Sequence, residues 1–129
     1  MSQTFKKGER LCNINQIKVL FENGNTIKAF PFKLIWKLTK EITEFPIQVL
    51  IAVPKRNIKK AVLRNKIKRK IREAYRKNKF ILLKEPTENQ DSLTLVLLFS
   101  GKEEISYIET ETKIIQLLLR LKNEYAKNN

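Results

Sequence analysis

A strongly basic segment with apolar residues at helical spacing is the feature that most limits how this chain can fold. Residues 55–79 contain eight lysines and five arginines against one acid, Glu73. Apolar residues recur every three or four positions in the same stretch, as on one face of an α-helix; they are Leu63, Ile67, Ile71, Ala74 and Tyr75. We therefore expect a helix over about residues 59–78 that packs by one face and presents cations on the other.

Helical geometry gathers these cations into a strip. At about 100° per residue, residues four apart form a row along the helix, and one such row consists of Arg64, Lys68, Arg72 and Arg76. The row beside it consists of Asn65 and Arg69. Like charges at this spacing cost a few tenths of a kcal/mol per pair, and a bound polyanion removes that cost while releasing counterions. The residues expected to bind nucleic acid are Lys55, Arg56, Lys60, Arg64, Asn65, Lys66, Lys68, Arg69, Arg72 and Arg76.

Composition excludes several classes of function. The 129 residues carry a formal charge of +14, most of it in the basic segment. The chain has no histidine, so a His-dependent catalytic triad is excluded. A single cysteine, Cys12, rules out an internal disulfide or a Cys cluster for zinc. Asp91 is the only aspartate, whereas two-metal nucleases need several close carboxylates. We expect no catalytic and no metal-binding side chains.

The rest of the sequence predicts an α-β-β-β-α-β-α order in one domain, residues 1–129. Residues 14–23 read as a helix capped by Asn13 and ended by Gly24. Residues 26–38 alternate as a strand that Pro31 should either split in two or place at an edge of the sheet. Residues 47–53 and 93–99 read as buried strands, residues 39–45 as a turn and residues 84–92 as a polar loop. Ser106 and Glu109 form a capping box for a last helix. A mostly antiparallel sheet with helices packed on it would bury the apolar faces.

Localisation and partners follow from charge and apolar runs. The longest unbroken apolar runs have five residues, whereas a membrane span needs about 20. We expect a cytoplasmic protein that binds nucleic acid. An anionic membrane surface is the weaker alternative, because the apolar side of the basic helix has no Trp or Phe. A structural RNA-binding protein of the ribosome would suit the same features.

Residues 53–76, VPKRNIKKAVLRNKIKRKIREAYR, resemble a known signature. The chain is similar here to the bacterial ribonuclease P protein component family, in which a strand and a Lys-rich turn precede a helix carrying Arg-Asn-Arg-x-Lys-Arg and then Arg-x-x-aromatic. The corresponding residues are Arg64-Asn65-Lys66-Ile67-Lys68-Arg69, then Arg72 and Tyr75. Lys66 replaces the third-position arginine, which keeps the charge and loses the bidentate fork. The resemblance, including an early Phe21-x-x-Gly24, extends over about residues 8–125.

This resemblance implies a fold and a function. The fold would be an α+β two-layer sandwich like that of ribosomal proteins, in which a left-handed β-α-β crossover joins residues 47–53, the basic helix and residues 93–99. The protein would assist a catalytic RNA that removes 5′ leaders from precursor tRNA. Hydrolysis would be carried out by that RNA with bound magnesium. The partners would be the catalytic RNA and precursor tRNA, with no obligate protein partner.

The resemblance also implies a central cleft, lined by the first helix and the sheet, that holds the single-stranded leader. The candidates are Ile17, Phe21, Phe32 and Trp36. On the sheet, a position that is often aromatic in the family is Ile35 here, next to Trp36. Base stacking on an aromatic is worth roughly 1–3 kcal/mol per base. Ordinary core packing explains Phe21, Phe32 and Trp36 equally well, so both interpretations stay open.

Overall fold

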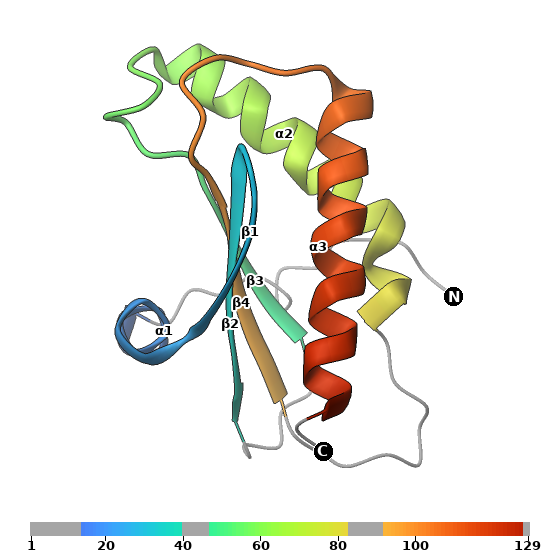
Figure 1. Ribbon diagram of the computed structural model, residues 1–129. Helices are drawn as coiled ribbons and strands as arrows, with labels where there is room; N and C mark the ends of the chain where they lie inside the picture. Colours follow the sequence, from blue (N-terminus) through green and yellow to red (C-terminus); the bar gives the residue numbers. More distant parts are fainter. Residues whose placement is uncertain (1–13, 40–46, 83–91, 128–129) are drawn as a thin grey trace.

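The structure contains the three helices and four strands expected from the sequence, in the expected order (Figure 1). The computed structural model describes residues 14–39, 47–82 and 92–127. The elements are α1 (Ile14–Asn23), β1 (Asn25–Ala29), β2 (Phe32–Thr39), β3 (Ile47–Ala52), α2 (Ala61–Asn78), β4 (Ser92–Phe99) and α3 (Tyr107–Lys127). One short 3₁₀ helix, η2 (Lys79–Leu82), extends α2 and was not predicted. Asn13, most of the expected turn at 39–45 and most of the polar loop at 84–92 lie outside the described residues.

The four strands form one sheet in the order β1-β2-β4-β3. Pro31 divides the expected long strand, and β1 and β2 pair antiparallel as a hairpin. β4 lies antiparallel to β2, with Trp36 opposite Leu95, and parallel to β3, with Val49 opposite Leu95. The sheet is therefore mostly antiparallel, and β3, α2 and β4 form its one crossover between parallel neighbours. The last strand of the sequence is thus an inner strand of the sheet.

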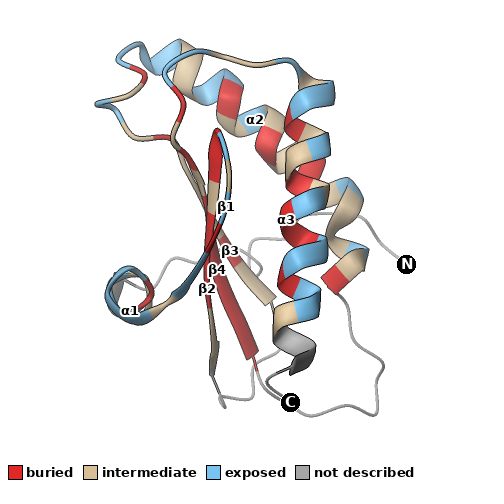
Figure 2. Cartoon of the chain, in the orientation of Figure 1, coloured by how far each residue is buried: buried red, intermediate tan, exposed pale blue. Residues whose placement is uncertain are grey.

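The two faces of the sheet are covered unequally. α2 and α3 pack on one face, and α1 lies on the other (Figure 1). Alternate residues of each strand point to opposite faces. Those facing α2 and α3 include Leu34, Leu95, Leu97 and Phe99, none of which is exposed to solvent. The opposite face has a much smaller buried cluster, consisting of Leu20, Ile35 and Val96 (Figure 2). α1 has only ten residues, so it leaves part of this second face open.

Local interactions explain where the helices begin and end. α2 begins at Ala61, two residues later than expected, and Lys60 precedes it in an extended conformation without a side-chain cap. α3 begins as predicted, with the Ser106 hydroxyl accepting a hydrogen bond from the Glu109 amide at 3.2 Å. Gly24 ends α1, but its φ is not positive. It is needed for close packing, because a Cβ there would lie 2.5 Å from the Leu20 carbonyl oxygen.

Candidate nucleic-acid interface

The connection between β3 and α2 is a tight turn fixed at both ends. Val53 and Ile58 are buried and anchor the chain on either side of it. Within the turn, the Pro54 carbonyl accepts hydrogen bonds from the amides of Asn57, at 3.1 Å, and Ile58, at 3.2 Å. Lys55 and Arg56 lie between these anchors and are exposed. The fold thus holds two cations on a fixed backbone that projects from the domain (Figure 1).

Arg64 has a structural role that its predicted place on the outer strip did not suggest. It is only half exposed. Its guanidinium donates hydrogen bonds to the carbonyls of Ile58, at 3.0 Å, and Lys59, at 2.8 Å. The prediction that Arg64 faces away from the domain was therefore wrong in part, because its position in the first turn of α2 lies beside the buried stripe. Arg64 ties the helix to the turn that precedes it.

Among the residues expected to bind nucleic acid, the following have side chains that form no hydrogen bond or ion pair with any described residue: Lys55, Arg56, Lys60, Lys68 and Arg69. Arg69 is exposed, as is the neighbouring Asn65, whereas Lys68 is half-buried. Arg72 is also half-buried, and its Nε is enclosed without a hydrogen-bond partner in the described part of the chain. Cations that the protein does not neutralise remain available to an anionic ligand.

Three other cations of α2 are engaged by the protein's own acids. Arg76 donates to Glu73, and this hydrogen bond lowers the pKa of the Glu73 carboxyl. On the other flank, the Lys70 Nζ lies 2.5 Å from a carboxylate oxygen of Glu104, and the Lys66 Nζ lies 3.6 Å from the other. Lys70 also donates to the carbonyl of Ile105 at 2.8 Å. The hydrogen bond from Lys70 is the main reason that the pKa of Glu104 is lowered. These contacts fix the β4–α3 connection against α2.

The four expected cleft residues do not come together. Phe32 and Trp36 are 1% and 2% exposed and belong to the core beneath α2 and α3, so their assignment to a cleft was wrong. Ile17 and Phe21 belong to α1, on the opposite face of the sheet. Ile17 packs against the small buried cluster there. Phe21 is 51% exposed and available for a contact.

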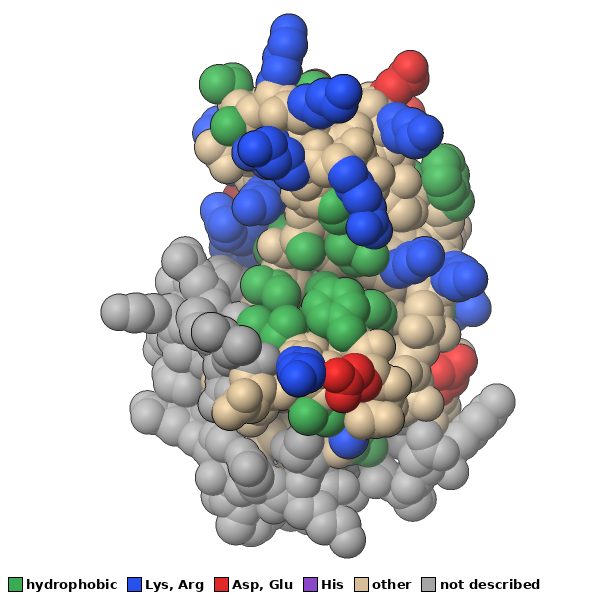
Figure 3. All heavy atoms as spheres, turned by 90° about the vertical axis from the view of Figure 1, so that its left-hand side faces the viewer, with side chains coloured by type: hydrophobic (Ala, Val, Ile, Leu, Met, Phe, Trp, Pro, Cys, Tyr) green, Lys and Arg blue, Asp and Glu red, His purple; other side chains and the backbone are tan. Residues whose placement is uncertain are grey.

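The alternation of β2 explains the error and shows what takes the place of the two aromatics. Phe32, Leu34 and Trp36 share one face, so the intervening Lys33, Ile35 and Lys37 point to the α1 side. Partly buried apolar residues of the neighbouring strands lie on the same face, namely Leu50, Ala52 and Leu98. Figure 3 shows an apolar patch on this side of the molecule with Lys and Arg side chains around it, mostly above. The period-two pattern of β2 already separates Phe32 and Trp36 from the lysines. The two residues were assigned to the cleft because they are aromatic.

Comparison with known proteins identifies the family. A family model described as Ribonuclease P matches residues 5–122. The chain belongs to the ribonuclease P protein family. A ribonuclease P protein component from Porphyromonas gingivalis is 30% identical over 115 residues, covering 89% of this chain and 84% of the relative. One from Chlorobium phaeobacteroides is 32% identical over 125 residues, covering 90% and 86%. Membership of the ribonuclease P protein family favours a protein that assists a catalytic RNA over a structural protein of the ribosome.

Solved ribonuclease P proteins share the fold. The protein from Thermotoga maritima superimposes with a TM-score of 0.68 at 24% identity, covering 87% of this chain and 96% of that one. The Staphylococcus aureus protein gives 0.64 at 22% identity, covering 89% and 95%. The expected α+β order is thereby confirmed.

Within residues 14–39, 47–82 and 92–127, no helix combines the length and apolar character that crossing a membrane requires. In the same ranges, His, Cys, Asp and Glu residues nowhere gather in threes as a metal site would need.

Proposed function

We propose that this chain is the protein subunit of ribonuclease P and binds the catalytic RNA of that enzyme through the β3–α2 turn and the outer face of α2. One observation carries the proposal: cations that have no partner in the described part of the chain project from a backbone that is fixed before any ligand binds. Lys55 and Arg56 lie on the anchored turn, and Arg69 lies on the exposed side of the helix. Because the turn is already ordered, binding an RNA backbone there costs little conformational entropy.

The second part of the proposal concerns precursor tRNA. Phe21 offers an exposed aromatic ring on α1, and Lys33 and Lys37 are half exposed on the same side of the sheet. An unstacked base can lie on an aromatic ring while lysines neutralise the neighbouring phosphates. This face, rather than Phe32 and Trp36, is where we place the 5′ leader.

The chemistry of leader removal belongs to the RNA in this proposal. The chain contains no histidine and a single aspartate. Among the residues that the structure describes, no three Asp, Glu, His or Cys side chains gather as a metal site would need, and we assign the magnesium to RNA phosphates. The protein contributes by reducing the repulsion between phosphates of the catalytic RNA and its substrate, which lowers the magnesium concentration that the complex needs.

Reconstitution with the cognate ribonuclease P RNA tests the first part. Adding the protein should lower the magnesium concentration required for precursor tRNA cleavage. Replacing Arg56, Lys60 and Arg69 together by alanine should reduce the slope of log K against log salt by about two to three, at roughly 0.7–0.9 per phosphate contact. The matched control is Lys122→Ala, which removes an exposed cation of α3. A slope equal to that of the wild type would refute the proposed interface.

Substrates with and without a leader test the second part. Phe21→Ala should weaken binding of precursor tRNA about fivefold, as expected for loss of one stacking contact, and leave binding of mature tRNA unchanged. Phe80→Ala removes a comparably exposed ring from η2 and serves as the control. Equal losses for both tRNAs, or for both variants, would contradict placing the leader on this face.

A further inference from the structure

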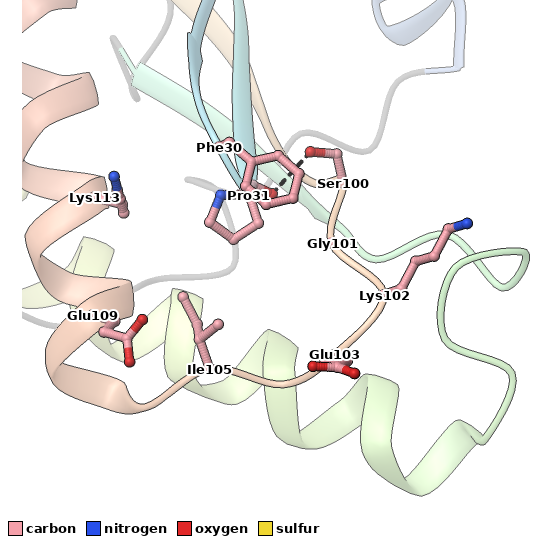
Figure 4. Close-up of a pocket in the computed structure, with 9 residues that line it drawn as sticks. All are labelled: Phe30, Pro31, Ser100, Gly101, Lys102, Glu103, Ile105, Glu109 and Lys113. Atoms are coloured by element: carbon pink, nitrogen blue, oxygen red, sulfur yellow. Dashed lines mark hydrogen bonds between the residues drawn. The ribbon is translucent and has the colours of Figure 1, made fainter.

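A pocket of about 520 Å³ lies outside the surfaces described so far (Figure 4). It is bounded by the β1–β2 turn with Phe30 and Pro31, by the β4–α3 connection with Gly101 and Ile105, and by α3 with Lys113. Its volume is within the range of about 300–1,000 Å³ typical of small-molecule sites. Figure 4 shows Phe30 and Pro31 opposite Ile105, with the α3 residues on one side.

The walls of this pocket are fixed by the fold. The amide and the hydroxyl of Ser100 both donate to the Pro31 carbonyl, at 2.7 and 3.0 Å, which locks the turn to the end of β4. Gly101 is buried, and a Cβ there would lie 2.8 Å from the Phe99 ring and 3.0 Å from Pro31. The cavity thus needs no rearrangement to open. Phe30 stands at its edge and is 76% exposed, although a large aromatic side chain gains from burial.

The lining suits one flat, polar-edged ring. Phe30 provides an aromatic face for stacking, and Ile105 provides an apolar surface across from it. The carboxylates of Glu103 and Glu109 can accept hydrogen bonds from an exocyclic amino group, and the ammonium of Lys113 can contact a phosphate. An aromatic face, acceptors and a cation together match a nucleotide better than an apolar peptide.

The pocket adjoins the basic helix. Glu104 lies between two lining residues, Glu103 and Ile105, and is paired with Lys66 and Lys70 of α2. Lys70 also donates a hydrogen bond to the Ile105 carbonyl. The β4–α3 connection therefore lies against the flank of α2 that carries Lys66 and Lys70, beside the outer face on which we place the RNA. A chain with a formal charge of +14 also favours a polyanion as the occupant.

We propose that this pocket is a second nucleotide-binding site, which takes one unstacked base of the RNA bound along α2. The inference rests on the proposed function, since it needs RNA on that helix. Phe30 stacks on the base, Glu103 and Glu109 accept from its amino group, and Lys113 contacts the adjoining phosphate.

The first experiment titrates the ¹⁵N-labelled full chain with cytidine 5′-monophosphate and follows backbone amide shifts. Saturable shifts at Gly101, Lys102 and Glu103 are expected, without equal shifts from ribose 5-phosphate, which lacks the base. Equal shifts from ribose 5-phosphate, or none from either, would overturn the site. Shifts only with a short apolar peptide would assign the pocket to a protein partner instead and would also overturn it.

The second experiment measures affinity for the cognate ribonuclease P RNA, with thermal unfolding to verify each fold. Phe30→Ala should weaken binding about fivefold, Phe80→Ala should not change it, and Arg69→Ala should weaken it independently. If Arg69→Ala weakens binding and Phe30→Ala does not, the pocket is not an RNA site and the proposed function stands. If neither weakens binding, both proposals fail.

Discussion

Replacing Arg64 separates the structural role of the signature arginine from its electrostatic role. In the structure its guanidinium donates to two backbone carbonyls, at 3.0 Å to Ile58 and 2.8 Å to Lys59. A hydrogen bond from a charged donor contributes about 1.5–3 kcal/mol when well enclosed. Since one acceptor is part-buried and the other exposed, we expect Arg64→Ala to reduce the free energy of unfolding by about 1.5 kcal/mol in total. For a chain of this size that corresponds to roughly 5 °C in Tm.

Urea denaturation of three variants measures this effect. Both hydrogen bonds come from the same guanidinium nitrogen, Nη1. Arg64→Lys keeps the charge, but its ammonium is one bond closer to the backbone than Nη1 and falls short of the two carbonyls, so this variant should remain destabilised. Arg69→Ala removes an exposed arginine with no described partner and should change stability by less than about 0.5 kcal/mol. If Arg64→Ala unfolds at the same urea concentration as the wild type, Arg64 does not stabilise the turn, and its role would be in RNA binding alone.

Three further substitutions test the packing. Ile71→Ala, at a fully buried position of α2, should cost about 2–5 kcal/mol in urea unfolding, and a cost under 1 kcal/mol would show that α2 is not docked there. Gly24→Ala should cost about 1–3 kcal/mol, because its Cβ would meet Leu20 and Ile35 at 2.5 and 2.7 Å; an unchanged Tm would contradict that contact. Glu104→Gln should be less stable than the wild type at neutral pH. The pKa of Glu104 is lowered below 4.5, so the stability that its carboxylate supplies is lost as pH falls through the folded pKa. The two proteins should therefore converge in acid in a pH series of thermal unfolding, and a constant difference would exclude the ion pair as the cause.

The sequence predicted the helices and strands because the apolar residues of each segment recur at one spacing, either that of a helix or that of a strand. The stripe Ile67–Ile71–Ala74–Tyr75 is the buried face of α2, as expected. Pro31 divided the first long strand, as its missing amide requires. The capping box at Ser106 marked the start of α3.

What the sequence could not decide was which sheet face each helix covers. Both faces of β2 contain large side chains, and period-two alternation says only that Trp36 and Ile35 differ in direction. Three-dimensional packing puts Trp36 under α2 and α3, and only that fact removes it from the leader surface. The inward position of Arg64 could have been predicted from the sequence, since a helical wheel places it on the same side of α2 as the buried Ile71.

The pocket was beyond sequence reasoning for a different reason. Phe30 and Gly101 are far apart in the sequence and belong to segments without a periodic pattern. They meet because β2 and β4 pair in a register that sets Phe32 opposite Phe99. Long-range strand pairing of this kind leaves no local trace.

The position of β4 has a consequence for how the protein is made. β4 pairs with both β2 and β3, yet it is translated after them and after α2. Until residue 99 has left the ribosome, the hairpin and β3 have no shared neighbour, and α2 has no complete sheet on which to dock. A truncated chain ending before residue 92 would therefore carry the entire arginine-rich signature and still lack the surface that displays it. Contacts this distant along the chain also slow folding relative to a helical bundle of the same size, because the long loops must close first.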